Sequence, residues 1–361
     1  MKAIAFVLAT LIVALVAGAG VVYLNREHIG AAVLREAARG SIFRDTIAAL
    51  PDGLHVAFCG TGSPFPSPSR SGPCTAVIAG KRLFVVDAGR GAADILVRMG
   101  LQAARLDAVF LTHFHSDHID GLGQLAEHHW LAGSARSPLK VWGTNGVERV
   151  ANGFNEAYAM NKEYRVAHEG ELAAEEGFGL SAQPFAFAAQ EERHVVLESE
   201  GLRVTAFLVN HRTVTHAVGY RFDYHGRSVV VSGDTAKSPV LVRVAAGADV
   251  LVHETMSPRV VAILAEAARA SGRDVPARLF GGVTDFHTRP PEAADQATQA
   301  RVRMLALTHF IPPVPMNPLL EDTFLEDARQ RFAGPLVLAE DGDLISVPLG
   351  QGPISRTNLL Y

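Results

Sequence analysis

One short segment of the chain concentrates side chains that bind metal ions. Residues 112–118 read Thr-His-Phe-His-Ser-Asp-His, so three histidines and one aspartate fall within six positions. The segment follows an apolar run at residues 107–111 that is typical of a strand. Alternate side chains of an extended chain point the same way, so His113 and His115 can reach one ion. Imidazole and carboxylate groups are the ligands expected for Zn²⁺, and we therefore predict a metal-binding loop here.

A site for two ions needs more ligands, and the residues that follow this loop supply candidates. A helix is expected next, and its start would carry Asp117 and His118 to a position adjacent to the first two histidines. His211, Asp234 and His309 each follow a later apolar run. Taken alone, each of these three could be an ordinary hydrogen-bonded or turn residue. Because all three follow strands, where loops assemble functional sites, we expect them to join the cluster.

The elements that must position these residues can be read from the periodicity of the chain. Strand-like runs dominate the first two thirds, helices are interleaved with them, and we find no internal repeat at a fixed period. This order predicts a layered α/β domain in which packed sheets are covered by helices. The expected strands are 54–58, 75–79, 83–86, 107–111, 139–142, 202–209, 217–222, 228–231, 250–252 and 304–307, and the expected helices are 117–131, 239–245, 258–270 and 291–299.

The motif Thr-His-x-His-x-Asp-His, with the later His, Asp and His, resembles the metallo-β-lactamase superfamily of binuclear metallohydrolases over about residues 54–348. The resemblance implies an αββα sandwich of two mixed sheets and two Zn²⁺ ions per chain, with manganese or iron as alternatives. It also implies that Asp87 is a buried support of the metal loop, although an ordinary turn aspartate is the alternative. By position, one ion would be held by His113, His115, His211 and Asp234, and the other by Asp117, His118, Asp234 and His309.

Further motifs resemble the RNase Z, arylsulfatase and phosphodiesterase-like branch of that superfamily. Gly-Thr-Gly-Ser-Pro at 60–64, Val-His-Glu-Thr at 252–255 and Phe-His-Thr at 286–288 resemble its glycine, His-Glu-Ala-Thr and His-Ser/Thr motifs, and the second departs after the glutamate. In that branch the glutamate and histidine form a proton-donating pair. The resemblance implies this role for Glu254 and His287, whose alternatives are a salt-bridged glutamate and a surface histidine.

The chemistry implied by the resemblance is hydrolysis. Two zinc ions about 3.5–4 Å apart can lower the pKa of a shared water to about 7 and neutralise charge that grows on an ester. Asp117 could orient or deprotonate that water, and Glu254 with His287 could protonate the leaving oxygen. We expect a phosphodiester or sulfate ester as the substrate, with a lactone or carboxylic ester, or RNase Z-like cleavage of RNA, as alternatives. An iron-dependent redox enzyme or a non-catalytic scaffold protein could also be built on such a fold, and the complete ligand set argues against the scaffold.

Composition limits the class of protein. The chain has 361 residues, 48% of them hydrophobic, and a net charge of −4, which suits one large or two small domains. Two cysteines exclude a disulfide-rich scaffold or a cysteine-ligated zinc ribbon. Residues 152–200, the least regular stretch, are interpreted as an insertion and hold ten acidic and three basic residues. Because a clamp on RNA should be basic, we expect a small anionic ester as the partner and regard nucleic acid as unlikely.

The N-terminal segment indicates export. Residues 3–24 carry no charge and would extend roughly 33 Å as a helix. An uncleaved signal anchor over residues 1–25 is favoured over a signal peptide, because the apolar run continues past a small-residue cleavage site; a buried core helix is a third reading. We therefore expect the protein on the periplasmic or extracytoplasmic side of a membrane, tethered by this helix or secreted after cleavage, and a homodimer is an option. The expected organisation is a helical stalk at 26–50, a hydrolase domain at 51–350 and a C-terminal tail at 351–361.

Two cysteines flank a loop rich in Pro and Ser. Cys59 and Cys74 lie 15 positions apart, and an exported location would permit a disulfide worth about 3 kcal/mol. Two unpaired buried thiols are an equal alternative. Arg70, inside this loop, is expected to be a solvated charge rather than a contact to an anionic substrate.

Overall fold

The computed structural model describes the chain except for residues 1, 39–43, 314–316, 351 and 361. The chain divides into two compact units, Met1–Asp45 and Thr46–Tyr361. The second unit contains every residue predicted to bind metal or to act in catalysis.

The described residues of the first unit form two helices, α1 (Lys2–Leu24) and α2 (Arg26–Ala37). Among the described residues, no single helix is long and apolar enough to cross a bilayer. Residues Thr10–Leu24 and α2 reach that length and composition only as a pair, which bends by 70°. The predicted anchor over residues 1–25 is therefore unsupported. The helical stalk predicted at 26–50 stays a prediction. α2 covers its first part, and residues 39–43 lie outside the described residues.

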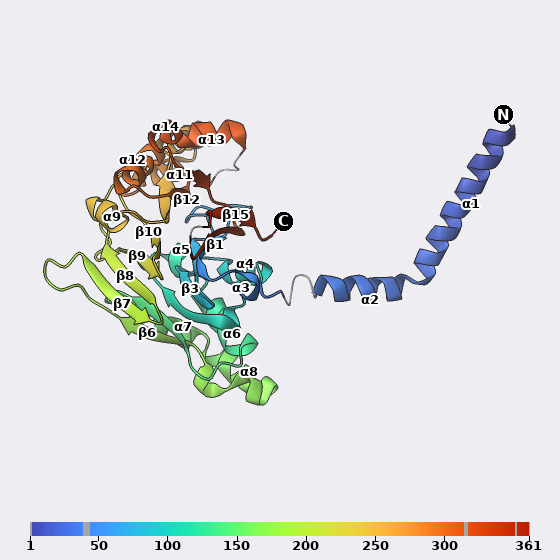
Figure 1. Cartoon of the computed structure of the whole chain (residues 1–361), viewed down its shortest axis with the longest axis horizontal. Helices are drawn as coiled ribbons and strands as arrows, with labels where there is room; N and C mark the ends of the chain where they lie inside the picture. The colour runs from blue at the N-terminus through green and yellow to red at the C-terminus, as the bar shows by residue number, and fades with distance from the viewer. Residues whose placement is uncertain (1, 39–43, 314–316, 351, 361) are drawn as a thin grey trace. The chain divides into compact units, whose positions relative to one another are not determined.

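Two mixed β-sheets form the centre of the second unit (Figure 1). One has eight strands in the order β15-β14-β1-β2-β3-β4-β5-β6, and the other has seven in the order β13-β12-β11-β10-β9-β8-β7. Strands β3 to β6 pair in parallel in the first sheet and β10 to β13 in the second, while the remaining neighbours pair antiparallel. The strands are β1 (Gly53–Gly60), β2 (Cys74–Ala79), β3 (Arg82–Val86), β4 (Leu106–Phe110), β5 (Leu139–Gly143), β6 (Leu180–Pro184), β7 (Arg193–Ser199), β8 (Leu202–Leu208), β9 (Val218–Tyr224), β10 (Arg227–Val231), β11 (Val250–Met256), β12 (Met304–Ile311), β13 (Leu336–Leu338), β14 (Asp343–Pro348) and β15 (Ser355–Asn358).

Aromatic side chains fill the space between the sheets. Phe110 of β4 contacts Tyr220 of β9 with ring centroids 5.3 Å apart, and Phe84 of β3 contacts Phe222 of β9 at 6.3 Å. All four rings are fully buried. Burying one such side chain stabilises the fold by about 1.5–3 kcal/mol. Every residue of β1 is buried as well, because that strand is covered on both faces.

Helices cover the outer face of each sheet, which confirms the predicted arrangement of two mixed sheets between helical layers. In Figure 1, α4 and α6 lie on one side of the sheets and α9 and α12 on the other. The helices of this unit are α3 (Thr46–Ala49), α4 (Ala92–Arg98), α5 (Ser116–Ile119), α6 (Leu122–Ala132), α7 (Val147–Ala157), α8 (Ala159–Glu169), α9 (Pro239–Val244), α10 (Pro258–Ala270), α11 (Asp274–Gly282), α12 (Pro290–Ala300), α13 (Pro318–Leu325) and α14 (Ala328–Arg331).

The helix predicted at 117–131 is broken into α5 and α6 at residues 120–121. The amide of Gly121 donates to the carbonyl of Ala88 at 2.8 Å, and a Cβ on Gly121 would lie 2.3 Å from the carbonyl oxygen of Gly89. Only glycine permits this approach of two backbones. The break separates the short helix that carries Asp117 and His118 from the covering helix.

Residues 152–200, the least regular stretch of the sequence, form regular elements of the domain. This stretch contains most of α7, all of α8, and β6 and β7, which are edge strands of the two sheets. Its strands were hard to recognise because edge strands expose much of their surface, as β7 does here. Whether the stretch is an insertion stays a prediction.

Whether residues 351–361 form a C-terminal tail stays a prediction, and part of this stretch is a strand. Within it, β15 pairs with β14 and extends the first sheet. Arg356 donates from its guanidinium to the buried carboxylate of Asp343 at 2.7 Å, which fixes the pairing. Residues 351 and 361 lie outside the described residues.

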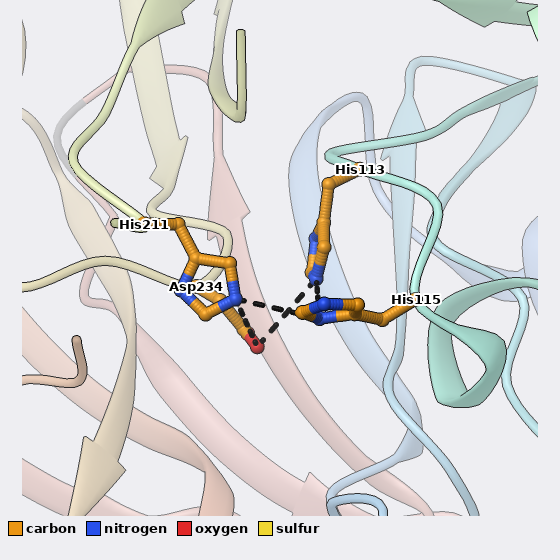
Figure 2. Close-up of side chains that lie close together, drawn as sticks. All are labelled: His113, His115, His211 and Asp234. Carbon is orange, nitrogen blue, oxygen red and sulfur yellow. Dashed lines mark hydrogen bonds and ion pairs between the residues drawn. The ribbon is translucent and has the colours of Figure 1, made fainter. Parts of the chain in front are cut away.

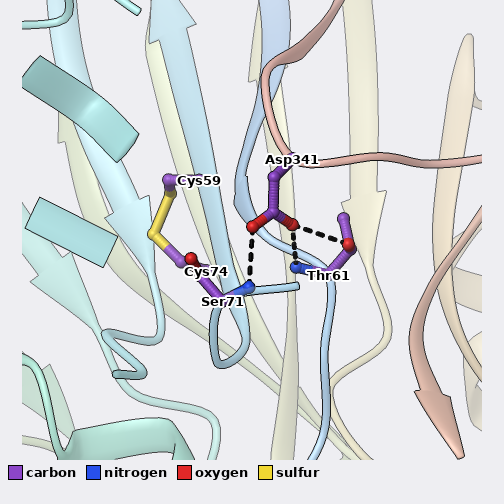
Figure 3. The surroundings of a disulfide bond; sticks show 5 residues. All are labelled: Cys59, Thr61, Ser71, Cys74 and Asp341. Atoms are coloured by element: carbon purple, nitrogen blue, oxygen red, sulfur yellow. Dashed lines mark hydrogen bonds between the residues drawn. A yellow bond between two sulfur atoms is a disulfide. The ribbon is translucent and has the colours of Figure 1, made fainter. Parts of the chain in front are cut away.

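The loop between Cys59 and Cys74 is closed by a disulfide (Figure 3). Beside it, the carboxylate of Asp341 accepts hydrogen bonds from the amide of Thr61 at 2.9 Å and from the amide of Ser71 at 2.7 Å. The solvated charge expected at Arg70 is a wrong prediction. Its buried guanidinium donates to Thr61 Oγ1 at 2.6 Å and to the carbonyl of Ala339 at 2.8 Å, so it braces the loop from inside.

Candidate metal centre

The predicted ligands converge at one edge of the two sheets, where loops follow the ends of β4, β8 and β10 and where β12 carries His309. The loop after β4 carries His113 and His115, and residues after β8 and β10 supply His211 and Asp234. The carboxyl ends of the parallel strands β10, β11 and β12 meet at this edge, which is the usual place for sites in α/β folds.

A β-bulge in β12 sets the orientation of His309, the last of the predicted ligands. In the pairing of β11 with β12, Glu254 faces Thr308 and the next residue faces Phe310, so His309 is the extra residue. His309 has a φ of 49°, in the left-handed region. Bulges of this kind bend a strand and redirect a side chain. Here the bulge leaves the His309 imidazole buried beside Asp117 and Asp234.

The first group of ligands contains His113, His115, His211 and Asp234, shown in Figure 2. Nε2 of His113 lies 2.8 Å from Nδ1 of His115, which lies 3.4 Å from Nε2 of His211. Oδ2 of Asp234 lies 3.9 Å from Nε2 of both His113 and His211. One donor atom from each side chain falls within 4.8 Å of the others, so one ion could contact all four.

The histidines of this group are held neutral. Burial lowers the pKa of His113 well below its ordinary value, and the neighbouring His118 lowers it further. Burial also lowers the pKa of His115 and that of His211. Neutral imidazole is the form that binds zinc, so the protein environment prepares these ligands.

The second group contains Asp117, His118 and His309, and it adjoins the first through Asp234. Nε2 of His118 lies 3.5 Å from Oδ2 of Asp117 and 3.4 Å from Oδ2 of Asp234. Nε2 of His309 lies 3.4 Å from Oδ2 of Asp117 and 3.4 Å from Oδ1 of Asp234. Oδ2 of Asp234 therefore lies near histidines of both groups, as an oxygen shared by two ions would.

The carboxylates of this group are held ionised. Burial alone would raise the pKa of Asp234, but His309 and His118 outweigh burial and hold it well below the usual range. The pKa of Asp117 is lowered in the same way, against burial, by His118 and His309. Conversely, burial is outweighed at His118 and His309, whose pKa values the surrounding carboxylates raise.

One polar atom shows that this donor set fits a metal pair. Nε2 of His118 is buried and makes no hydrogen bond of good geometry to any described residue, although it points toward two carboxylates. Buried polar atoms without a partner are rare in folded proteins. A cation between His118, Asp117 and Asp234 would satisfy this nitrogen and both carboxylates. Imidazoles with a shared carboxylate are the ligand chemistry of two-metal hydrolytic sites.

Asp87 orients the loop that carries the ligands. Its Oδ1 accepts the amide of Thr112 at 2.8 Å, and its Oδ2 accepts Thr112 Oγ1 and Nδ1 of His118, each at 2.8 Å. The hydrogen bond to Nδ1 leaves Nε2 of His118 free for an ion, which is the usual outer-shell arrangement of metal sites. Thr112 and the carbonyl of Phe286, which accepts Nδ1 of His211 at 3.2 Å, were not identified from the sequence. The sequence signal that could have identified these two groups is that each lies next to a predicted site residue.

Glu254 and His287 form a buried pair next to the ligands. Oε1 of Glu254 accepts Nδ1 of His287 at 3.1 Å and the amides of Thr235 and Thr288 at 3.1 and 3.0 Å. The His287 ring lies 5.2 Å from that of His211 between centroids. One donor atom from each of Asp234, His287 and His309 lies within 4.8 Å of the others, so His287 faces the centre.

Comparison with known proteins identifies the family. The profile described as "Metallo-beta-lactamase superfamily" matches residues 68–309. The Ribonuclease Z of Mycobacterium marinum is 32% identical over 290 residues, which are 80% of this chain and 96% of that protein. The chain belongs to the metallo-β-lactamase superfamily, in its RNase Z branch. The Ribonuclease Z of Mycolicibacterium gilvum is likewise 32% identical, over 82% of this chain and 97% of that protein.

Solved structures agree with this superfamily fold. The short form of human tRNase Z matches with a TM-score of 0.60 and 22% identity, over 82% of this chain and all of that chain. The metallo-β-lactamase fold protein YhfI of Bacillus subtilis matches with a TM-score of 0.56 and 19% identity, over 81% and 99%. At these identities the two structures support the fold alone.

The relatives correct one prediction about partners. Nucleic acid was expected to be an unlikely partner, and relatives named Ribonuclease Z contradict that. The prediction rested on the acidic residues between 152 and 200, but those residues build helices and edge strands of the domain. The net charge of a segment does not show which basic side chains of the protein face the site. The relatives also give no support to the expected sulfate ester substrate.

Proposed function

We propose that this chain is a metal-dependent phosphodiester hydrolase that cleaves RNA, with two zinc ions in its centre. The observation that carries the proposal is the arrangement of two ligand groups that share Asp234 and adjoin the Glu254–His287 pair. The RNase Z relatives, which the chain matches over 96–97% of their lengths, support RNA as the substrate. Small phosphodiesters share the scissile bond and serve as test substrates.

The seven ligands would divide between the two ions as their grouping suggests. The first ion would contact His113, His115, His211 and Asp234, and the second would contact Asp117, His118, His309 and Asp234. Bound there, the two ions would supply Lewis-acid stabilisation of the phosphate and a nucleophilic water at neutral pH.

The side chains of the protein would orient the reactants and move protons. The ionised carboxylate of Asp117 can accept a hydrogen bond from the attacking water and orient it. His287 directs Nδ1–H to Glu254, and its other nitrogen faces the centre. As an imidazolium, which Glu254 stabilises, His287 can donate the proton on that nitrogen to the leaving oxygen of the cleaved bond. Glu254 is itself fixed by two backbone amides, which hold the His287 ring in one orientation.

Export remains a separate proposal. The uncharged run at residues 3–24 supports targeting to the extracytoplasmic side, with retention or cleavage of the segment as the two routes. Cell fractionation with an antibody to the second unit, together with the mass of the mature protein, tests it. A full-length chain found only in the cytoplasm would contradict export.

The function is tested with the full chain, loaded with zinc, on a labelled precursor tRNA and on bis-p-nitrophenyl phosphate. We expect cleavage of both, loss of activity with a chelator, and recovery with zinc. p-Nitrophenyl sulfate and a homoserine lactone serve as comparison substrates. His115→Ala and Asp234→Ala should abolish hydrolysis with the fold retained, as judged by circular dichroism. Cleavage of the sulfate or lactone but of neither phosphodiester would contradict the proposal, and so would full activity in either variant.

A further inference from the structure

A hollow opens beside the metal centre, between the ligands and the Pro- and Ser-rich loop. Its volume is about 390 Å³, and its lining includes Ser63 and Pro64 of the loop, Asp117 of the centre, and Arg90. We call it the inner hollow. A second hollow of about 590 Å³, the outer hollow, shares Arg90 with the first and reaches Arg98 of α4. Arg90 therefore lies where the two hollows meet.

The backbone at Arg90 is fixed between the metal loop and the Pro- and Ser-rich loop. Its carbonyl accepts the amide of Gly72 at 2.8 Å, and the amide of Gly89 donates to the carbonyl of Pro73 at 2.9 Å. A Cβ on Gly89 would lie 2.4 Å from the carbonyl oxygen of Asp117, so this turn packs directly on the residue that carries a ligand. The backbone position from which the Arg90 side chain extends is thus fixed by its neighbours' contacts with Asp117 and with the Pro- and Ser-rich loop.

The guanidinium of Arg90 is available to a ligand. Arg90 is exposed, and among the described residues its guanidinium takes part in no hydrogen bond or ion pair. Other arginines near the centre are already engaged, because Arg212 pairs with Asp285 at 2.8 Å and Arg70 is buried inside its loop. An exposed, unpaired guanidinium beside a cationic metal centre is suited to an anion.

Acidic groups also line these hollows, and they would compete with a bound phosphate for the Arg90 guanidinium if they lacked other partners. Both oxygens of Asp341 already accept hydrogen bonds, one from Thr61 and one from Ser71, so this carboxylate is stabilised without an arginine partner. Asp117 would be neutralised by the metal pair it faces. Asp120 is the remaining carboxylate of the inner hollow, and Glu340 also lines the outer hollow; among the described residues neither forms an ion pair with Arg90. Arg90 therefore keeps a charge that a substrate can use.

We propose that Arg90 binds the phosphate that neighbours the scissile phosphodiester of an RNA strand, and so positions that strand along the inner and outer hollows. This inference rests on the proposed function, because it takes the scissile phosphate to lie at the metal centre. A guanidinium offers two parallel N–H donors to a phosphate, which fixes direction as well as adding affinity. A small diester has only one phosphate and cannot use this contact, so Arg90 distinguishes a polymeric substrate from a small one.

The test compares Arg90→Ala with Arg90→Lys and with Arg203→Ala in the full zinc-loaded chain. Arg203 lies at the start of β8, at the other end of that strand from His211, and its loss removes the same charge. For a short oligoribonucleotide we expect Arg90→Ala to raise KM about tenfold with little change in kcat. The effect on bis-p-nitrophenyl phosphate should be at least fivefold smaller. Arg90→Lys should recover part of the loss, since it keeps the charge but not the paired donors. Arg203→Ala should match the unmodified chain.

A binding measurement keeps this inference separate from the proposed function. Stopped-flow fluorescence anisotropy of a labelled oligoribonucleotide with an excess of the full zinc-loaded chain reads binding before hydrolysis. Arg90→Ala should weaken that binding about fivefold and lower the slope of log Kd against log salt by about 0.7, the value for one phosphate contact on a single strand. Equal losses in Arg90→Ala and Arg203→Ala, or no binding by the unmodified chain, would overturn the inference. If the unmodified chain binds the strand through Arg90 but hydrolyses neither phosphodiester, only the proposed function fails.

Discussion

Replacing Asp87 with Asn should weaken metal binding without unfolding the protein. The Asp87 carboxylate holds Thr112 and Nδ1 of His118 through three contacts of 2.8 Å. Asn can keep an acceptor toward Thr112, and it tolerates the left-handed φ of 59° at this position. Its NH₂ group, however, would face Nδ1 of His118 and favour the proton on Nε2, the nitrogen that an ion requires.

The size of this effect follows from the contact that is lost. Outer-shell partners of metal ligands are worth about 10–100-fold in affinity, which is about 1.4–2.7 kcal/mol. We therefore expect Asp87→Asn to bind the more weakly held zinc 10–100-fold less tightly. Asp87→Ala would instead leave buried donors unsatisfied, at about 1–3 kcal/mol for each, and is expected to lower the free energy of unfolding as well.

The assay is a competition titration of zinc against a chromophoric chelator, with the Tm measured on the metal-free protein. Asp107→Asn is the matched control, because Asp107 also accepts from a backbone amide and an arginine but lies away from the ligands. The reasoning is refuted if Asp87→Asn takes up both zinc ions as tightly as the unmodified chain, or if Asp107→Asn loses zinc equally.

Three further predictions use other parts of the structure. Glu254→Gln and His287→Ala should each lower kcat on RNA about 100-fold but affect bis-p-nitrophenyl phosphate much less, because p-nitrophenolate leaves without a proton; equal losses on both substrates would contradict proton donation. Reducing the Cys59–Cys74 disulfide should cost about 3 kcal/mol and lower the Tm by several degrees, whereas a reductant should not change the Tm of the Cys59→Ala, Cys74→Ala double variant. Zinc binding at neutral pH should release protons, because His118 and His309 have raised pKa values in the metal-free protein and must each lose a proton to bind. Zinc affinity should therefore fall as the pH is lowered. Calorimetry in buffers of different ionisation enthalpy measures the proton release, and its absence would contradict this prediction.

The metal loop could be predicted from sequence because its ligands are local and follow a clear strand. His113, His115, Asp117 and His118 lie within six positions, and strand periodicity places them after β4. His211, Asp234 and His309 were expected to join the site because each follows a strand, and the resemblance then divided the ligands between two ions. The bulge at His309 was not visible in the sequence, because it arises from the pairing of β11 with β12.

The parts that sequence missed are those decided by tertiary contacts. The edge strands β6 and β7 are half exposed and lack a strong alternating pattern, and β15 is a short polar segment that is ordered by its pairing with β14. The break between α5 and α6 depends on the carbonyl of Ala88, which lies more than thirty positions earlier. Arg70 is buried because Thr61, Ala339 and the ring of Phe310 surround it, and a charged residue in a Pro- and Ser-rich loop gives no sign of this.

Anomalous diffraction from crystals of the zinc-loaded chain, recorded on both sides of the zinc absorption edge, tests the central claim most directly. Two peaks of comparable height are expected about 3.5–4 Å apart, one within reach of His113, His115 and His211, the other within reach of Asp117, His118 and His309, with Asp234 between them. A single peak, or peaks away from Asp234, would contradict the binuclear centre on which the proposed hydrolysis depends.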